Sequence, residues 1–151
     1  MSHYYSLLRE ATACGLTVIE KRLKSKAKGI IKGTKIGLQH ELLKVEKICV
    51  LAEEVGHHHT AVGDFTDQSK LENRKKERLG RVWSYEYLIP LSLIVAAGQA
   101  GIQGRHAVAE YLEVTEEFLL HSIEHYQRKY GLYTSFNNYL IYFDPLSITK
   151  M

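Results

Sequence analysis

The sequence predicts a mainly helical α+β fold with a small β-sheet or hairpin near the N-terminus. Apolar residues recur at helical spacing in several segments, whereas the strand-like segments are a short run and a glycine-rich hairpin before residue 40 and an apolar, aromatic run over 139–143. No linker and no internal repeat divides the chain. Its 151 residues fit one domain, so we expect a single domain over 1–151.

The N-terminal part of the chain is predicted to contain a helix and then strands. Residues 4–14 carry apolar side chains at helical spacing, and Gly15 ends the pattern. Residues 16–19 are β-branched and predict a strand. Residues 28–39 place three glycines among isoleucines, which predicts a tight hairpin that turns near Gly33.

The middle of the chain is predicted to be helical, and its expected elements can be given in order. These are a helix over 41–58, a polar loop over 60–69, a helix from about 71 to Pro90, and shorter helices over 90–97 and 105–112. Thr115 is the expected N-cap of the last helix and Gly131 its end. We expect 105–131 to form a C-terminal helical pair and 132–151 to form a tail that covers the core.

Composition indicates a cytoplasmic protein. The two cysteines, Cys14 and Cys49, lie in apolar helical contexts and are expected to be reduced, buried thiols. Residues 1–11 lack the charged start and apolar core of a signal peptide. The most apolar run, 88–97, is shorter than the ~20 residues that a membrane span needs. We expect no membrane partner.

Two features raise the question of nucleic-acid binding. Seven basic residues fall between positions 21 and 35, in a chain of net charge +3. They could form a patch for an acidic partner, but no aromatic residues interleave them, which favours a solvated hairpin edge. Residues 107–126 have the rhythm of a helix-turn-helix, yet its second helix opens with Glu116 and Glu117, which would face phosphates. We expect no direct nucleic-acid contact, so a DNA-binding regulator is the least favoured function.

The helix over 41–58 carries a candidate metal site. Glu53 and His57 stand four apart, so their side chains lie on one face, and Glu54 lies about 100° around the helix. A zincin peptidase needs two ligands on successive turns and an adjacent carboxylate. Glu77, on the next helix, is the candidate third ligand. His121 and His125 also stand four apart, but their apolar neighbours favour a solvated or half-buried helix face.

These residue types predict hydrolytic chemistry. Three protein ligands leave a cation with an open position for water, and the ion lowers the pKa of that water and polarises the scissile carbonyl. Glu54 is the expected general base. Candidates for stabilising the oxyanion are Tyr85, Tyr87 and His58. Zn²⁺ is the expected ion; because Glu53 adds an anionic ligand, Mn²⁺ or Fe²⁺ are alternatives.

Several segments together resemble the ImmA/IrrE family of metallo-endopeptidases, in its phage and mobile-element branch. Residues 51–58 read Leu-Ala-Glu-Glu-Val-Gly-His-His, 73–77 read Asn-Arg-Lys-Lys-Glu, and 83–90 read Trp-Ser-Tyr-Glu-Tyr-Leu-Ile-Pro. With the segment from Ala109 to Gly131, the resemblance extends over about residues 4–131. It implies a zincin-like domain whose small sheet packs on the metal-binding helix.

The resemblance also implies roles for individual residues. Glu54 corresponds to the catalytic carboxylate, and His57 and Glu77 correspond to ligands. Glu53 stands where the family pattern has its first histidine, so its role as a ligand is our inference. The implied substrate is a protein, typically a helix-turn-helix repressor encoded nearby.

In zincins, the substrate commonly adds a strand to a sheet edge above the metal helix. The expected edge here has Thr34, Ile36 and Leu38. The alternative is a hairpin that only closes the core. The alternative to the enzyme as a whole is a non-catalytic regulator that keeps the peptidase fold and binds its partner, a possibility that the glutamate at position 53 keeps open.

Overall fold

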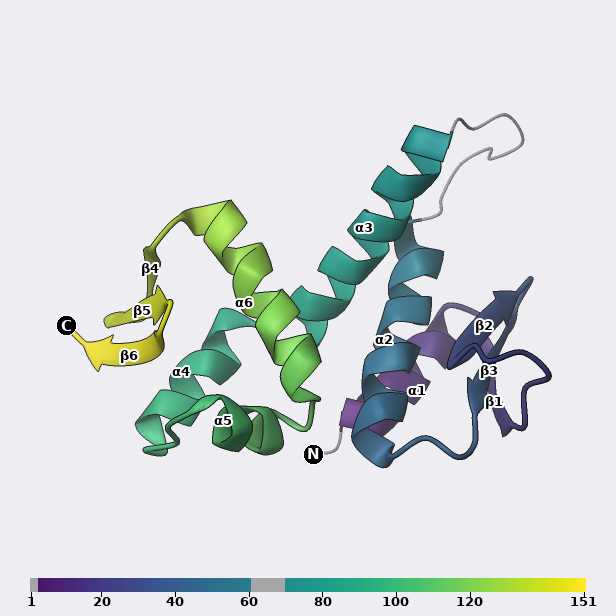
Figure 1. Cartoon of the computed structure of the whole chain (residues 1–151), viewed down its shortest axis with the longest axis horizontal. Coiled ribbons are helices and arrows are strands. Elements are labelled where there is room, and N and C mark those ends of the chain that lie inside the picture. Colours follow the sequence, from purple (N-terminus) through teal and green to yellow (C-terminus); the bar gives the residue numbers. More distant parts are fainter. Residues whose placement is uncertain (1–2, 61–69) are drawn as a thin grey trace. The chain divides into compact units, whose positions relative to one another are not determined.

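A computed structural model describes residues 3–60 and 70–151 (Figure 1). It confirms the expected mainly helical α+β class, with two small three-stranded sheets. The chain forms two compact units, one up to Ser84 and one from Tyr85 to Met151. Apart from Thr60, the expected loop over 60–69 lies outside the described residues.

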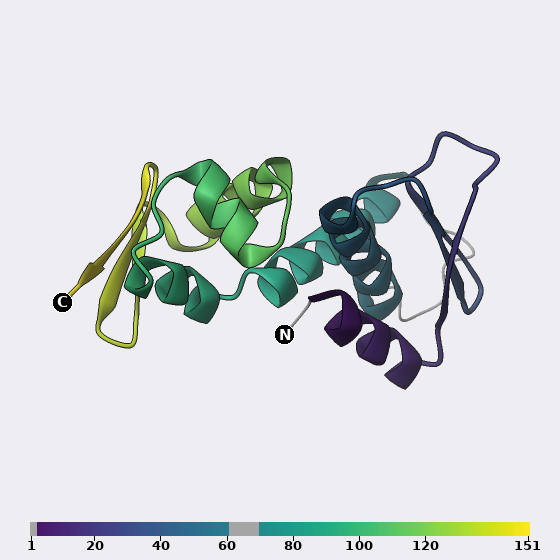
Figure 2. The same ribbon diagram turned by 90° about the horizontal axis from the view of Figure 1, so that it is seen from below.

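The first unit combines two helices with the first sheet. Helix α1 (His3–Ala13) leads to strands β1 (Thr17–Lys21), β2 (Gly29–Lys32) and β3 (Lys35–Gln39), and α2 (Lys44–Thr60) follows. The expected hairpin is confirmed, since β2 pairs antiparallel with β3. Helices α1 and α2 lie on the same side of the sheet (Figure 2), and their apolar faces close the core. The following residues are fully buried: Leu7, Ile36, Leu38, Leu51 and Val55.

Strand β3 is the central strand of its sheet, so the predicted substrate edge is wrong. The order is β1-β3-β2, with β1 parallel to β3 on one side and β2 antiparallel on the other. Ile36 and Leu38 are fully buried, and the Thr34 carbonyl already accepts a hydrogen bond from the Thr17 backbone at 2.8 Å. An added strand would find no unpaired backbone on β3, because the edges of this sheet are β1 and β2.

Helix α3 (Lys70–Leu88) crosses α2 at a pair of glycines. A Cβ atom at Gly56 would overlap the carbonyl oxygen of Gly80, and a Cβ atom at Gly80 would overlap the ring of His57. The two backbones therefore touch at this point, because glycine at both positions leaves no side chain between the helices. This crossing holds the metal-motif segment of α2 against α3.

A three-way polar contact joins the other elements of the first unit. The Tyr4 hydroxyl donates a hydrogen bond to Oε2 of Glu20 at 2.5 Å, and the Lys47 ammonium lies 2.5 Å from Oε1 of the same carboxylate. These three residues belong to α1, β1 and α2. Lys47 makes the largest contribution to lowering the pKa of Glu20, and the hydrogen bond from Tyr4 makes the next largest. The carboxylate is therefore held in its charged form.

The second unit has short helices and the second sheet. Its elements are the end of α3, then α4 (Leu91–Gln99), α5 (Arg105–Leu112), α6 (Glu116–Tyr130), β4 (Tyr133–Phe136), β5 (Tyr139–Phe143) and β6 (Leu146–Lys150). The expected capping is confirmed: the Thr115 side chain accepts a hydrogen bond from the Phe118 backbone, and Gly131 ends α6 with a positive φ.

The C-terminal segment is a sheet where the sequence predicts a covering tail. Strands β4, β5 and β6 pair antiparallel in order, and Asn137 and Asn138 both take positive φ angles in the turn between the first two. Ile141 and Phe143 are buried, so this sheet still covers the core against α4 and α6. Within the described residues, no helix combines the length and the apolar character needed to cross a membrane.

Candidate functional site

The predicted metal motif lies at the edge of the buried face of α2. Ile48, Leu51, Ala52 and Val55 face the core, which leaves the two glutamates and His57 half-buried beside them. The side chain of Glu54 is 14% exposed and that of His57 is 28% exposed. This placement follows from helical periodicity, because Glu53, Glu54 and His57 occupy positions next to those whose apolar side chains face the core.

His57 has one ring nitrogen with a partner and one without. Its Nδ1 lies 3.7 Å from Oε2 of Glu54, which is an ion-pair distance and too long for a hydrogen bond. Its Nε2 is buried and has no hydrogen-bond partner among the described residues. Because a buried polar atom without a partner costs free energy, the Nε2 atom is available to a ligand that the described residues do not supply.

The electrostatic surroundings of His57 are anionic. Its contact with Glu54 raises the pKa of His57, burial opposes this, and the negative charges of Glu53 and Glu77 raise it further. Three carboxylates therefore act on one imidazole. Such a field favours a positive charge at this position, whether on the ring or on a bound cation.

Glu77, the predicted third ligand, is turned partly away. It lies three residues before Gly80, on the face of α3 that contacts α2, but its side chain is 59% exposed and its Oε1 lies 4.0 Å from Nη2 of Arg81. Among the described residues, Glu53, His57 and Glu77 do not form a group whose ligand atoms all lie within 4.8 Å of one another. For Glu77 and His57 to bind the same ion, the Glu77 carboxylate would have to leave Arg81 and turn toward His57.

The three candidates for oxyanion stabilisation occupy different surroundings. His58 is half-buried on α2, with its ring 6.2 Å from that of His59. Tyr85 is buried in the second unit, in contact with Phe118 at 5.3 Å between ring centroids, which favours a packing role. Tyr87 is half-buried near the end of α3.

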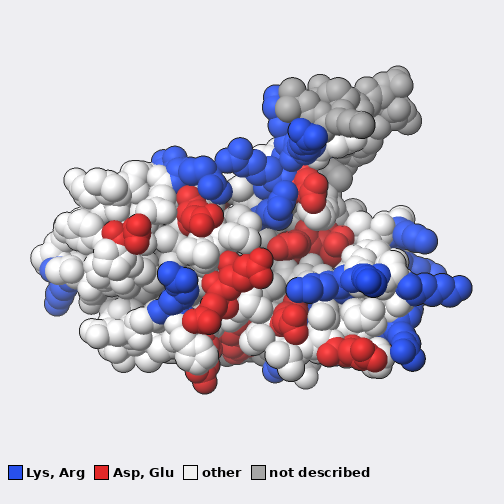
Figure 3. Space-filling model, in the orientation of Figure 1, with Lys and Arg blue, Asp and Glu red and all other residues white. Residues whose placement is uncertain are grey.

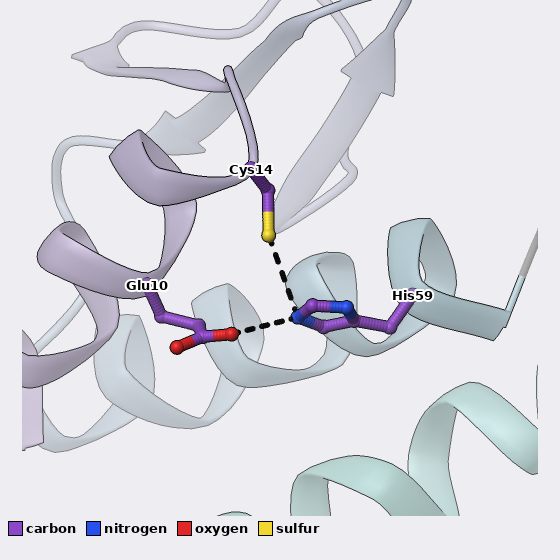
Figure 4. A group of neighbouring side chains, drawn as sticks. All are labelled: Glu10, Cys14 and His59. Atoms are coloured by element: carbon purple, nitrogen blue, oxygen red, sulfur yellow. Dashed lines mark hydrogen bonds and ion pairs between the residues drawn. The ribbon is translucent and has the colours of Figure 1, made fainter.

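A second group of potential ligands lies in the first unit, and sequence reasoning missed it. Glu10, Cys14 and His59 bring a carboxylate, a thiol and an imidazole together with all three ligand atoms within 4.8 Å (Figure 4). Glu10 and Cys14 are four apart at the end of α1, a spacing visible in the sequence, but His59 lies 45 positions further on, in α2. Cys49, in contrast, is buried as expected.

Basic side chains gather over α3 in Figure 3, where Arg74, Lys75, Arg78 and Arg81 are exposed. One of them, Arg81, lies 4.0 Å from the carboxylate of Glu77, so a cation already neighbours the predicted third ligand.

Comparison with known proteins identifies the family. The family model of the IrrE N-terminal-like domain, Peptidase_M78, matches residues 11–124. The chain belongs to this family. No curated protein matches the sequence. Membership in the IrrE N-terminal-like family supports a metallopeptidase-like function, which in general terms involves a metal ion and a protein substrate.

The residues at the motif of this IrrE-like chain fit a divalent cation. The supporting observation is the buried, unpartnered Nε2 of His57, within reach of the charges of three glutamates. Glutamate in place of a first histidine makes the ligand set harder than that of a two-histidine site, because carboxylate oxygen replaces imidazole nitrogen. A zinc, manganese or ferrous ion suits such a set.

Proposed function

We propose that the protein is a metal-dependent endopeptidase in which Glu53, His57 and Glu77 hold the ion and Glu54 is the general base. The observation that carries this proposal is the buried Nε2 of His57, which has no partner in the part of the chain that the structure describes and lies in the field of three carboxylates. Zn²⁺ is the proposed ion, with Mn²⁺ or Fe²⁺ as alternatives.

The proposed chemistry divides between the ion and the side chains. When bound, the ion supplies a Lewis acid that polarises the scissile carbonyl and lowers the pKa of a water molecule. The Glu54 carboxylate accepts the proton of the attacking water at one oxygen and delivers it to the nitrogen of the leaving amine. The half-buried position of Glu54 beside His57 supports this role, because it keeps the carboxylate next to the proposed ion.

Glu54 also has a contact that suits a second role. Its carboxylate lies 3.7 Å from Nδ1 of His57, so orienting the imidazole is the alternative to the role of base. A base and an orienting residue differ in what their removal changes. Loss of the base lowers turnover at full metal occupancy, whereas loss of an orienting residue lowers metal affinity about 10–100-fold.

We propose as substrate a helix-turn-helix repressor of a phage or mobile element, cleaved in the cytoplasm where it binds DNA. This follows from the family resemblance of the sequence and from the metallopeptidase-like function that the family supports. The protein itself is not proposed to touch DNA.

The test combines a metal assay with a cleavage assay. The purified chain is loaded with Zn²⁺ and incubated with the repressor encoded nearest to its gene, and mass spectrometry follows the fragments. We expect two fragments whose masses sum to the repressor plus one water. The Glu54→Gln variant should bind the repressor and the metal and yield no fragments. Cleavage by Glu54→Gln at the rate of the unaltered chain would refute the proposal.

A non-catalytic regulator is the second candidate. It is favoured by Glu53 in place of histidine and by the separation of the predicted ligand atoms. In that case, the unaltered chain and Glu54→Gln would bind the repressor equally and leave it intact at full zinc occupancy.

A further inference from the structure

We propose that Glu10, Cys14 and His59 form a separate site for a thiophilic divalent cation such as Zn²⁺, which fastens α1 to α2. The site lies within the first unit and shares no residue with the proposed peptidase centre. Its ligand set differs in kind, because it includes a cysteine sulfur, whereas Glu53, His57 and Glu77 offer only oxygen and nitrogen.

Two of the three distances between ligand atoms are close to those of a zinc shell. In a tetrahedral site with Zn–S about 2.3 Å and Zn–N about 2.0–2.1 Å, the sulfur and nitrogen stand about 3.6 Å apart. The observed distance from Cys14 Sγ to His59 Nε2 is 3.6 Å. The nitrogen–oxygen separation in such a shell is about 3.4 Å, and Oε1 of Glu10 lies 3.0 Å from the same Nε2. Small side-chain rotations would complete the shell.

The hydrogen bonds within the group leave one side chain poorly satisfied. Both contacts end on the same nitrogen of His59, as Figure 4 shows. An imidazole nitrogen carries either one hydrogen or one lone pair, so it serves one of these partners well. If Nε2 carries the hydrogen and donates to Glu10, it has no lone pair to accept from the thiol; if it accepts from Cys14, it has no hydrogen to donate to the carboxylate. A cation among the three atoms satisfies all of them at once.

The three side chains are held in place by the surrounding structure. Glu10 and Cys14 lie one turn apart, and the Cys14 backbone still donates to the Glu10 carbonyl at 3.1 Å, so the helical geometry persists to the cysteine. Gly15 then leaves the helix with φ of 78°. On the other side, the ring of His59 packs on the ring of Trp83, with 4.8 Å between centroids. The ligands therefore have little freedom to separate.

The site remains accessible to an ion. The side chain of His59 is 29% exposed and that of Glu10 is 35% exposed, and Cys14 is half-buried. Three protein ligands with partial exposure leave a fourth position for water. On binding, Cys14 loses its thiol proton to solvent and its sulfur becomes an anionic ligand. Thiolate and imidazole together select zinc over magnesium or calcium.

Cobalt provides a test that depends on the sulfur. Co²⁺ occupies zinc sites, and a cysteine thiolate bound to it gives a charge-transfer absorption in the near ultraviolet, which oxygen and nitrogen ligands do not give. We expect this absorption when Co²⁺ is added to the reduced, metal-free chain, and its loss when Zn²⁺ is added in excess. Its absence at saturating Co²⁺ would overturn the proposal.

Matched variants assign the absorption to this site. Cys14→Ser should abolish it, and Cys49→Ser, which alters the other cysteine, should keep it. The opposite pattern would refute the assignment. Should Cys14→Ser fail to fold by circular dichroism, Glu10→Gln gives a second test, because it keeps the thiol but removes an anionic ligand. It should shift the cobalt titration to at least tenfold higher concentration, and an unchanged titration would count against the site.

The outcome is independent of the peptidase proposal. His57→Asn should remove the proposed peptidase metal but leave the thiolate–cobalt absorption intact. Loss of cleavage with the absorption retained would separate the two sites, and loss of the absorption in His57→Asn would show that they are one.

Discussion

His57 in the first unit and His125 in the second have similar surroundings, yet their pKa values shift in opposite directions. Each is largely shielded, each has an Nε2 without a hydrogen bond, and each lies near a glutamate. The pKa of His57 is nonetheless raised, and that of His125 is lowered. Burial acts in the same direction on both, so the difference comes from the neighbouring charges.

The balance of neighbouring anions and cations differs between the two histidines. Around His125, Nε2 lies 3.4 Å from Oε2 of Glu86, but Lys129 holds the other oxygen of that carboxylate at 2.8 Å. Desolvation is then the main influence on the pKa of His125, and the charges of Lys129 and Arg128 lower it further. Around His57, the carboxylates of Glu53, Glu54 and Glu77 prevail over burial. A buried imidazole thus indicates a cation site only where the nearby anions outweigh both burial and the nearby cations.

The largest expected effect is at Glu54. We expect Glu54→Gln to lower the rate of substrate cleavage by about 10²–10⁴-fold, because the amide cannot accept a proton from water. Zinc content, measured by elemental analysis, should stay unchanged. Glu110→Gln, at a side chain that is 78% exposed, is the control and should keep full activity. A fall in zinc content equal to the fall in rate would instead assign Glu54 an orienting role.

The difference between His57 and His125 can be tested by making the same substitution, glutamate to glutamine, beside each histidine. Glu77 is the residue to change near His57, and Glu86 is the one near His125. Glu77→Gln should lower zinc affinity by at least ~10-fold, because it removes an anionic ligand. Glu86→Gln should leave zinc affinity unchanged, since His125 is not proposed to bind metal. Calorimetric titration of both variants with Zn²⁺ measures this. Equal losses in the two variants would remove the distinction between the sites.

Gly80→Ala should destabilise the fold by about 1–3 kcal/mol, because its Cβ would overlap the ring of His57. The next residue, Leu79, is 53% exposed, so Leu79→Ala should change stability by less than about 0.5 kcal/mol. Urea unfolding followed by circular dichroism compares the two. A silent Gly80→Ala would mean that α2 and α3 can separate at low cost.

The smallest expected effect is a pH dependence at His125. Its pKa is lower in the folded than in the unfolded chain, so its contribution to stability is fully present above the ordinary histidine value, near pH 6.5. It declines as the pH falls from there toward the folded pKa. Between about pH 7.5 and about pH 5.5, thermal unfolding of the unaltered chain should shift downward more than that of His125→Gln. Equal shifts would contradict this assignment.

The helical part of the fold could be predicted because its signals are local. Thr115 and Gly131 bound α6 by capping chemistry, and the helical spacing of Cys49 and Ala52 indicates the buried side of α2. The same locality limited the prediction of the first sheet. The hairpin is visible in residues 28–39, but the parallel pairing of β1 with β3, which makes β3 central, depends on a contact across the intervening strand.

The residues of the two proposed metal sites also differ in whether their positions depend on local spacing or on contacts between helices. Glu53, Glu54 and His57 follow from spacing on one helix, whereas the position of Glu77 depends on how two helices cross. The Glu10–Cys14–His59 group joins two helices that the sequence separates by 45 positions, so only half of it, the four-residue spacing on α1, was visible. The paired asparagines at 137 and 138 were a turn signal for the second sheet, and both adopt the positive φ angles such turns require.

The contact of Gly56 with Gly80 also limits how α2 and α3 can accommodate a substitution. Side chains that pack between helices can change rotamer, but two backbones in contact have no rotamers to change. A side chain at either position therefore fits only if its surroundings move apart. Glu77 lies one turn from Gly80, so a wider separation of the helices would also carry its carboxylate away from His57. The two glycines thereby set the helix spacing on which the proposed metal centre depends.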